Sequence, residues 1–175
     1  MPNACTAACH PTRPLTAPAR RRRVPTALLR TLMGLGLLLG SLATGASTPE
    51  PMRLTSLDDT PITAQVLRPA GAARGVVVAL HGCGGLYAGP SGERLASRHL
   101  AMAELIVAQG WAAVLPDSFN PRGAREVCRQ KISERGIRQA QRRADALGTL
   151  RWVQQQPEWA SAAPGGKPLP VVLLG

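Results

Sequence analysis

The sequence predicts an α/β protein with a mostly parallel sheet flanked by helices. Three short apolar runs, at residues 76–80, 111–115 and 170–174, alternate with two segments of helical periodicity. The runs lack the polar alternation of a half-exposed strand, which is typical of strands that are buried on both faces. The order strand, helix, strand, helix, strand favours parallel strands joined by helical crossovers.

Two weaker strand patterns precede this unit. Residues 52–57 and 62–68 show partial alternation and are separated by a turn-forming segment at residues 58–61. This pattern predicts a β-hairpin or two consecutive antiparallel strands. A glycine-rich loop at residues 81–92 follows the first buried strand.

Two helices are expected between the buried strands. The first covers residues 94–109 and ends at Gly110, and the second covers residues 133–156, with Ser133 as a candidate N-cap. Apolar spacings of three and four residues predict which face of each helix packs on the sheet. For the first helix these residues are Leu95, His99, Met102, Leu105 and Ile106, and for the second they are Ile137, Ala140, Ala144, Leu147, Leu150 and Val153.

The first 46 residues have the layout of a targeting segment. Six basic residues precede an uncharged apolar centre at residues 32–42, and small residues follow at 43–46. This layout predicts a secretory signal peptide, export to the periplasm or the medium, and a folded domain over residues 47–175. The alternative is an uncleaved membrane anchor, although 11 apolar residues at about 1.5 Å each span only about half of a bilayer core.

The charge balance argues against nucleic acid as a partner. The formal net charge is +11 for the whole chain but only +5 from residue 47 onward, where there are 15 basic and 10 acidic residues. The chain also has only five aromatic residues that could stack on bases. The sequence contains no metal-ligand spacing, phosphate loop or dinucleotide fingerprint, so we expect no metal or cofactor. Beyond export we expect no stable membrane partner, and no pattern indicates an oligomeric state.

The segment His81-Gly82-Cys83-Gly84-Gly85 is the most informative motif, since it directly follows a buried strand and precedes a helix. Closely spaced glycines allow a tight turn and bring main-chain N–H groups close to a ligand. An ordinary tight connection is the alternative interpretation. The strand and helix context favours a loop that donates hydrogen bonds to a developing oxyanion.

Several of these segments together resemble the dienelactone hydrolase family of the α/β-hydrolase superfamily. The resemblance covers nearly all of the chain after residue 46, although each motif is short. It is carried by residues 76–87, by Leu115-Pro116-Asp117-Ser118-Phe119 with Pro121-Arg122-Gly123, by Arg142, Asp145, Ala146, Leu147 and Trp152, and by residues 171–175. It implies a hydrolase of small esters or lactones. In that interpretation the Cys83 N–H lies in the oxyanion hole, and Gly82 and Gly84 shape its approach.

The same resemblance implies where the catalytic residues belong. In this family the third buried strand leads into a nucleophile elbow, G-x-S-x-G or its cysteine version, whose first glycine would be Gly175. We therefore expect the nucleophile, the acid and the histidine of acyl transfer to follow Gly175, and the chain as given to be an inactive N-terminal half of the fold. The alternative is an exported, non-catalytic binding or structural domain on the same scaffold.

Cys83 and Cys128 are the only cysteines after residue 46. An oxidising compartment permits a disulfide between them, while two separate thiols are the alternative, because the sequence does not supply the Cα separation that a bridge requires. Cys83 as a catalytic nucleophile is disfavoured, since it follows the wrong strand for this family.

The remaining polar candidates have structural interpretations. We expect His81 to end its strand with a satisfied hydrogen bond rather than to act as a base. Asp117 follows a strand end, where functional carboxylates occur, but bracing of the next loop is the preferred interpretation. His99 is expected to pack in the core. A solvated helix face is expected for Arg135, Arg138, Arg142 and Arg143.

Overall fold

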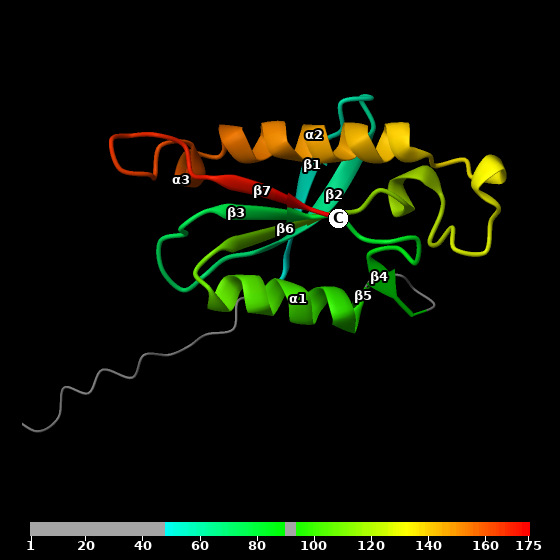
Figure 1. Cartoon of the computed structure of the whole chain (residues 1–175), viewed down its shortest axis with the longest axis horizontal. Coiled ribbons are helices and arrows are strands. Elements are labelled where there is room, and N and C mark those ends of the chain that lie inside the picture. Colours follow the sequence, from blue (N-terminus) through cyan, green and yellow to red (C-terminus); the bar gives the residue numbers. More distant parts are fainter. Residues whose placement is uncertain (1–47, 90–93) are drawn as a thin grey trace, which may run out of the picture. The chain divides into compact units, whose positions relative to one another are not determined.

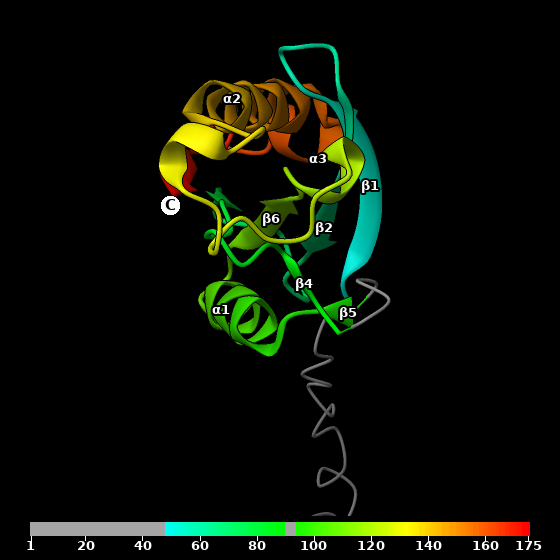
Figure 2. The same ribbon diagram turned by 90° about the vertical axis from the view of Figure 1, so that its right-hand side faces the viewer.

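A computed structural model describes residues 48–89 and 94–175, so the expected targeting segment lies outside the described residues. The described chain forms three layers (Figure 1, Figure 2). One face of the central sheet is covered by α1 (Ser97–Ala108), and the other by α2 (Gln139–Gln155) and α3 (Pro157–Ala160). Within the described ranges, no helix combines the length and the apolar character that crossing a bilayer requires.

The central sheet has five strands in the order β1-β2-β6-β3-β7. Their bounds are β1 (Glu50–Thr55), β2 (Pro61–Leu67), β6 (Ala112–Pro116), β3 (Val76–Ala79) and β7 (Val171–Leu174). β2 runs antiparallel to both of its neighbours, β1 and β6, while β3 is parallel to both β6 and β7. The predicted mostly parallel sheet flanked by helices is confirmed, and the predicted hairpin is β1–β2.

The apolar runs of β3 and β6 are buried on both sides because successive side chains enter different cores. The run of β7 was expected to be buried in the same way, but this strand lies at the edge of the sheet and leaves Val172, Leu173 and Leu174 exposed. Val76 and Val78 of β3 pack into the core that lies under α2 and α3, where Val153 and Trp159 meet them. Ala79 at the end of the same strand belongs to the core under α1. A strand between two helical layers has no solvent face, and this explains the missing polar alternation.

The first helix is shorter than predicted. Arg94–Leu95 forms β5, which pairs antiparallel with β4 (Tyr87–Ala88), and the helix begins only at Ser97. Leu105, expected on the inward face, is 70% exposed, whereas His99 is buried as predicted. The fully buried Ala103 lies in the contact with the sheet, so the helix touches its neighbours along a narrow strip that excludes Leu105.

The second helix also differs from its prediction. It begins at Gln139, while Ser133 lies in a preceding 3-10 turn and caps nothing; the Arg138 N–H instead bonds the Gln141 side chain at 3.0 Å. Ala140 is exposed, and of the predicted inward residues within the helix only Val153 is buried. The buried residues of the helix are Asp145, Ala146, Gly148, Thr149 and Val153. The buried face contains a carboxylate and a glycine, and apolar periodicity therefore predicted the wrong face of the helix.

Gly148 lets α2 approach the β1–β2 turn at backbone distance. A Cβ at this position would lie 2.5 Å from the Thr55 carbonyl oxygen and 2.7 Å from Ser56 Cα. The Leu57 N–H also donates to the Ala144 carbonyl at 3.1 Å. The contact is therefore made of main-chain atoms that cannot move aside.

A buried carboxylate joins α2 to two loops. Both oxygens of Asp145, which is fully buried, accept hydrogen bonds from Arg122 at 2.8 and 3.0 Å. The same guanidinium bonds Asp58 in the hairpin turn at 2.9 Å and the Ser118 carbonyl at 3.0 Å. Burial opposes the charge of Arg122, but its bonds to Asp145 and Asp58 outweigh this and raise its pKa. This network fixes the loop after β6 against α2 and the hairpin.

We predict that Gly148→Ala destabilises the protein. The new methyl group would gain about 1 kcal/mol of helix propensity but collide with the backbone of the β1–β2 turn, and overpacking of this kind costs about 1 to 3 kcal/mol. Urea unfolding should therefore show a net loss of stability. Gly71→Ala is the matched control, because no atom lies within 4 Å of its Cβ position. A more stable Gly148→Ala protein would contradict this packing.

We also predict that Asp145→Ala lowers the free energy of unfolding by about 3 to 5 kcal/mol, because it leaves the mostly buried Arg122 without its main partner. Denaturant unfolding measures this loss. In the control, Glu134→Ala breaks an exposed pair with Lys131, 3.5 Å long, and should cost less than about 1 kcal/mol. Equal losses in both variants would show that the Arg122 network contributes no more than a surface pair.

Candidate functional site

The carboxyl ends of β3, β6 and β7 lie at one edge of the sheet, which is where α/β proteins bind ligands. The Leu80 N–H donates to the Leu174 carbonyl at 2.7 Å, and the Cβ position of Gly175 lies 3.4 Å from the Leu80 side chain. The glycine-rich loop after β3 therefore begins directly beside the end of β7.

The carbonyl groups at the start of this loop are held by donors within the protein. The guanidinium of Arg142 donates to the His81 carbonyl oxygen. The Gly82 carbonyl accepts the Gly85 N–H at 3.2 Å, and the His81 ring contacts it through Nδ1 at 2.8 Å. These bonds fix two successive peptide planes.

Further donors come from other parts of the fold. The Val127 N–H, in the loop after β6, donates to the Cys83 carbonyl at 2.8 Å. His99 of α1 reaches the Gly85 carbonyl through Nε2 at 3.1 Å. The orientation of the loop thus depends on both helical layers and on the neighbouring loop.

Anchored carbonyls aim the N–H groups that share their peptide planes. The described peptides are all trans, so each N–H points away from the carbonyl of the preceding residue. Within the described part of the chain, the N–H groups of Gly82, Cys83 and Gly84 donate to no protein acceptor, whereas the Gly85 N–H is used inside the turn. Three free main-chain donors therefore follow one another at the end of β3.

Gly85 is required by the shape of this turn. Its φ of +78° is a conformation that other residues rarely adopt. A Cβ would also lie 2.1 Å from the Arg125 carbonyl oxygen. The loop closes against the backbone of its neighbour here, and only glycine permits that approach.

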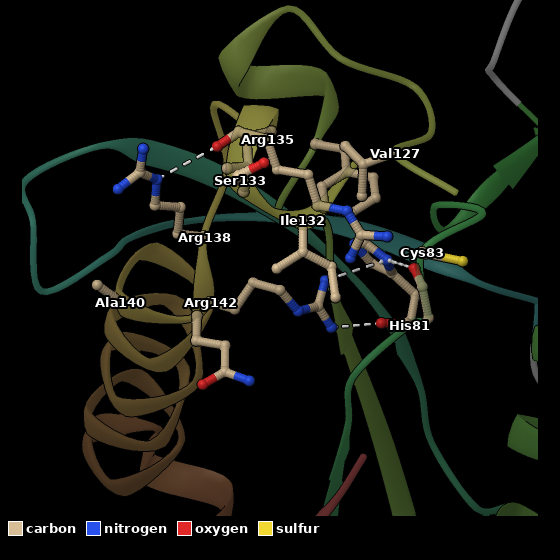
Figure 3. Close-up of a pocket in the computed structure, with 13 residues that line it drawn as sticks. His81, Cys83, Val127, Ile132, Ser133, Arg135, Arg138, Ala140 and Arg142 are labelled. Carbon is tan, nitrogen blue, oxygen red and sulfur yellow. Dashed lines mark hydrogen bonds between the residues drawn. The ribbon is translucent and has the colours of Figure 1, made fainter. Parts of the chain in front are cut away.

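A cavity of about 740 Å³ adjoins the loop, and His81, Gly82 and Cys83 are among the residues that line it. His81 and Cys83 are labelled in Figure 3. The volume of the cavity lies in the range of small-molecule sites. The opposite wall comes from the loop after β6 and the start of α2. Apolar side chains there are Phe119, Val127, Ile132 and Ile137, and the cations are Arg135, Arg138 and Arg142.

The prediction that Arg142 lies on a solvated helix face is wrong. The Arg142 guanidinium is half-buried, lies 5.5 Å from the centre of the Phe119 ring, and points to His81 (Figure 3). Burial lowers the pKa of Arg142, since its charge loses water. Arg138 and Arg143 are exposed as predicted, and Arg135 is half-buried.

His81 has the structural role predicted for it. Its Nε2 accepts the Ser118 N–H at 3.1 Å, and its Nδ1 lies 2.8 Å from the Gly82 carbonyl, so the proton of the neutral ring belongs on Nδ1. The residue is only 2% exposed. Burial, aided by the charge of Arg142, lowers the pKa of His81 to about 4.

Asp117 braces the following loop, as predicted. Its Oδ1 accepts the N–H groups of Phe119 at 2.9 Å and Asn120 at 3.3 Å. Burial raises the pKa of Asp117 in spite of these bonds. The carboxylate lies 3.9 Å from His81 Nε2, beyond hydrogen-bond distance, because that nitrogen is taken by the Ser118 N–H.

The structure joins Cys83 and Cys128 in a disulfide, with a Cα–Cα distance of 4.9 Å. Cys83 therefore carries no free thiol that could act as a nucleophile. The bond ties the centre of the glycine-rich loop to the loop after β6. Among the described residues, no group of three or more His, Cys, Asp or Glu side chains could hold a metal ion.

No family model matches the sequence, and no curated protein matches it. Solved structures that resemble the chain include esterase Est22, at 19% identity and a TM-score of 0.42, with 66% of this chain and 32% of that chain covered. The acylaminoacyl peptidase of Pyrococcus horikoshii matches at 21% identity and a TM-score of 0.42, covering 66% of this chain and 18% of that one.

An α-amino acid ester hydrolase is a third similar structure, at 21% identity and a TM-score of 0.42. The match covers 86% of this chain and 24% of that one. The chain thus spans about a third or less of the length of these three proteins. These likenesses are too distant to assign it to a family.

The burial of His81 predicts that the stability of the protein depends on pH. The pKa of His81 is about 4 in the folded protein against 6.5 when unfolded, so the unfolded chain binds more protons between these values. Stability is therefore full above pH 6.5 and is lost as the pH falls toward 4, by about 3 kcal/mol from this group. Urea unfolding from pH 7.5 to 4 measures the loss.

In the control, His81→Gln removes the titrating ring and keeps a side-chain acceptor. Other groups titrate in both proteins, so the difference between the two stability curves isolates His81. We expect the difference to shrink as the pH falls. Parallel curves would contradict a neutral buried ring.

Proposed function

We propose that the protein is a hydrolase of small esters or lactones, similar to the dienelactone hydrolase family, and that the loop after β3 supplies its oxyanion hole. The observation that carries this proposal is the set of three free N–H groups at Gly82, Cys83 and Gly84, beside the end of a parallel strand. In α/β-hydrolases the loop after the third strand provides one oxyanion donor, and the residue after the nucleophile provides the other.

In the proposed reaction a serine or cysteine that follows β7 attacks the ester carbonyl carbon. A histidine accepts the proton of the nucleophile, and an acid orients that histidine. The alcohol then leaves with a proton from the histidine, and water hydrolyses the acyl-enzyme by the same route. The short distance between Leu80 and the end of β7 supports this arrangement, because it brings a residue just after Gly175 close to the loop.

The loop contributes by binding negative charge that develops only in the transition state. A single donor of this kind is worth about 2.7 to 4 kcal/mol, since it is aimed before the reaction begins. The bonds that fix the carbonyls of His81, Gly82 and Cys83 supply that preorganisation. The Cys83 N–H is our choice of principal donor because the resemblance to the dienelactone hydrolase family implies it, and both Cys83 and Gly82 line the cavity.

The adjoining cavity suits a small substrate with an apolar part. Phe119, Val127, Ile132 and Ile137 offer apolar contacts, and the nearby arginines add positive potential where the oxyanion forms. We further propose that the protein is exported by its N-terminal segment and acts in the periplasm or outside the cell on a small-molecule ester.

The proposal predicts hydrolysis of p-nitrophenyl acetate and of a simple aryl lactone by a protein that continues past Gly175 into a nucleophile elbow. A protein that ends at Gly175 should show no turnover above background. In the longer protein, Gly85→Ala should lower kcat at least 100-fold, because the new Cβ displaces the turn that aims the free N–H groups. Initial rates by absorbance measure both effects.

Two controls keep this test specific. Gly71→Ala adds a methyl group in open space and should keep wild-type activity. Circular dichroism and size-exclusion chromatography should show that Gly85→Ala remains folded. A longer, folded protein that binds esters or lactones without cleaving them would overturn the hydrolase proposal and favour a non-catalytic binding domain.

A further inference from the structure

The only disulfide among the described residues lies where the proposed oxyanion donors are. Cys83 contributes both a free N–H and one of the two sulfur atoms, and its carbonyl accepts the Val127 N–H at 2.8 Å. Val127 directly precedes Cys128 in the chain. The Cys83–Gly84 peptide is thus held from its side chain and from its carbonyl by two adjacent residues of another loop.

That second loop is itself fixed to the body of the protein. Arg122 holds its beginning through Asp145 and the Ser118 carbonyl, and Val127 is buried in a small cluster with Phe119 and Ile137. A disulfide to a fixed loop restrains its partner more than a disulfide to a free one. By contrast, Cys83 itself is exposed and has glycine on both sides, so neither of its chain neighbours offers a side chain that could hold it in place.

Both cysteines are exposed to solvent, so a reductant has access to the bond. Exposed disulfides are the ones that thiols reduce most readily. We propose that the Cys83–Cys128 disulfide is a reversible positioning element of the oxyanion loop, and that its reduction by an external dithiol lowers the rate of ester hydrolysis. This inference rests on the proposed function.

The chemistry is a thiol–disulfide exchange with a dithiol as the reductant. One thiolate of the reductant attacks a protein sulfur, the S–S bond breaks, and a mixed disulfide forms. The second thiol of the reductant resolves it. The protein gains two electrons and two protons as free thiols at Cys83 and Cys128, and the reductant becomes a cyclic disulfide. Reoxidation restores the bond.

The test compares the active, longer protein with and without dithiothreitol, at a temperature well below unfolding. Rates are divided by the concentration of active sites, taken from the burst amplitude of a p-nitrophenyl ester, so that partial unfolding does not count as slower catalysis. We expect kcat for each active site to fall at least tenfold on reduction, with KM changed less than twofold. Reoxidation should restore the rate.

Cys128→Ser is the decisive variant, since Cys128 supplies neither an oxyanion donor nor a group that contacts substrate. It should have the low kcat of the reduced protein and no further response to the dithiol. The lack of response would also exclude effects of the dithiol at any other cysteine. A Cys128→Ser protein with wild-type kcat for each active site would overturn the positioning role and leave the proposed hydrolase function intact.

A second measurement does not depend on activity. On reduction, the Val127 N–H should exchange with deuterium at least tenfold faster, because its acceptor on Cys83 becomes mobile, while the Ala103 N–H in α1 stays unchanged. Unchanged exchange at Val127 would overturn the inference even in an active enzyme. If the wild-type protein has no esterase activity, the proposed function fails, and faster exchange would still show that the disulfide holds the loop.

Discussion

The loop after β3 has its shape because the carbonyl groups of His81, Gly82, Cys83 and Gly85 accept hydrogen bonds from within the protein, whereas the N–H groups of Gly82, Cys83 and Gly84 donate to no acceptor in the described part of the chain. Each donor comes from a different part of the chain: Arg142 from α2, Val127 from the loop after β6, and His99 from α1. His81 and Gly85 are buried, so a carbonyl left without a partner at either residue would cost about 1 to 3 kcal/mol. Alternative orientations of these peptides therefore carry a penalty, and the free N–H groups stay aimed in one direction.

Two of those donors depend in turn on the Arg122 network. Asp145 fixes Arg122, which holds the beginning of the loop that carries Val127. Asp145 and Gly148 determine the position of α2 against the rest of the protein. Arg142 lies one helical turn before Asp145, so the position of α2 also determines whether Arg142 can contact His81. The polar face of α2 is thus a structural requirement of the loop, and burial of an uncompensated charge is avoided because Arg122 pairs with Asp145.

The strands of the central sheet could be predicted because a strand that is buried on both faces lacks the polar alternation of a half-exposed strand. The runs at Val76 and Ala112 contain no polar residue and are buried, and β-branched residues suit such strands. The run at Val171 has the same composition but forms an exposed edge strand, so composition predicted the strand and not its burial. The helix faces could not be predicted in the same way. Gly148 and Asp145 are buried for reasons of close approach and ion pairing, which apolar periodicity does not detect. Sequence reasoning likewise placed Arg142 in solvent, because its partner is a carbonyl oxygen 61 residues away.

Only part of the structure of the loop could be predicted from its residue types. Glycines predicted a tight turn with accessible N–H groups, but which of these groups remain free depends on tertiary partners such as Val127 and Arg142. Spacing left the pairing of Cys83 with Cys128 open, since 45 residues separate them and the loop after β6 brings them together. Cys83 contributes both a main-chain N–H donor and a sulfur atom that anchors the loop, and a substitution can remove the sulfur without removing the N–H. A side-chain substitution at Cys83 removes the sulfur and keeps the N–H, so any loss of transition-state stabilisation would come from the aim of that donor and not from its absence.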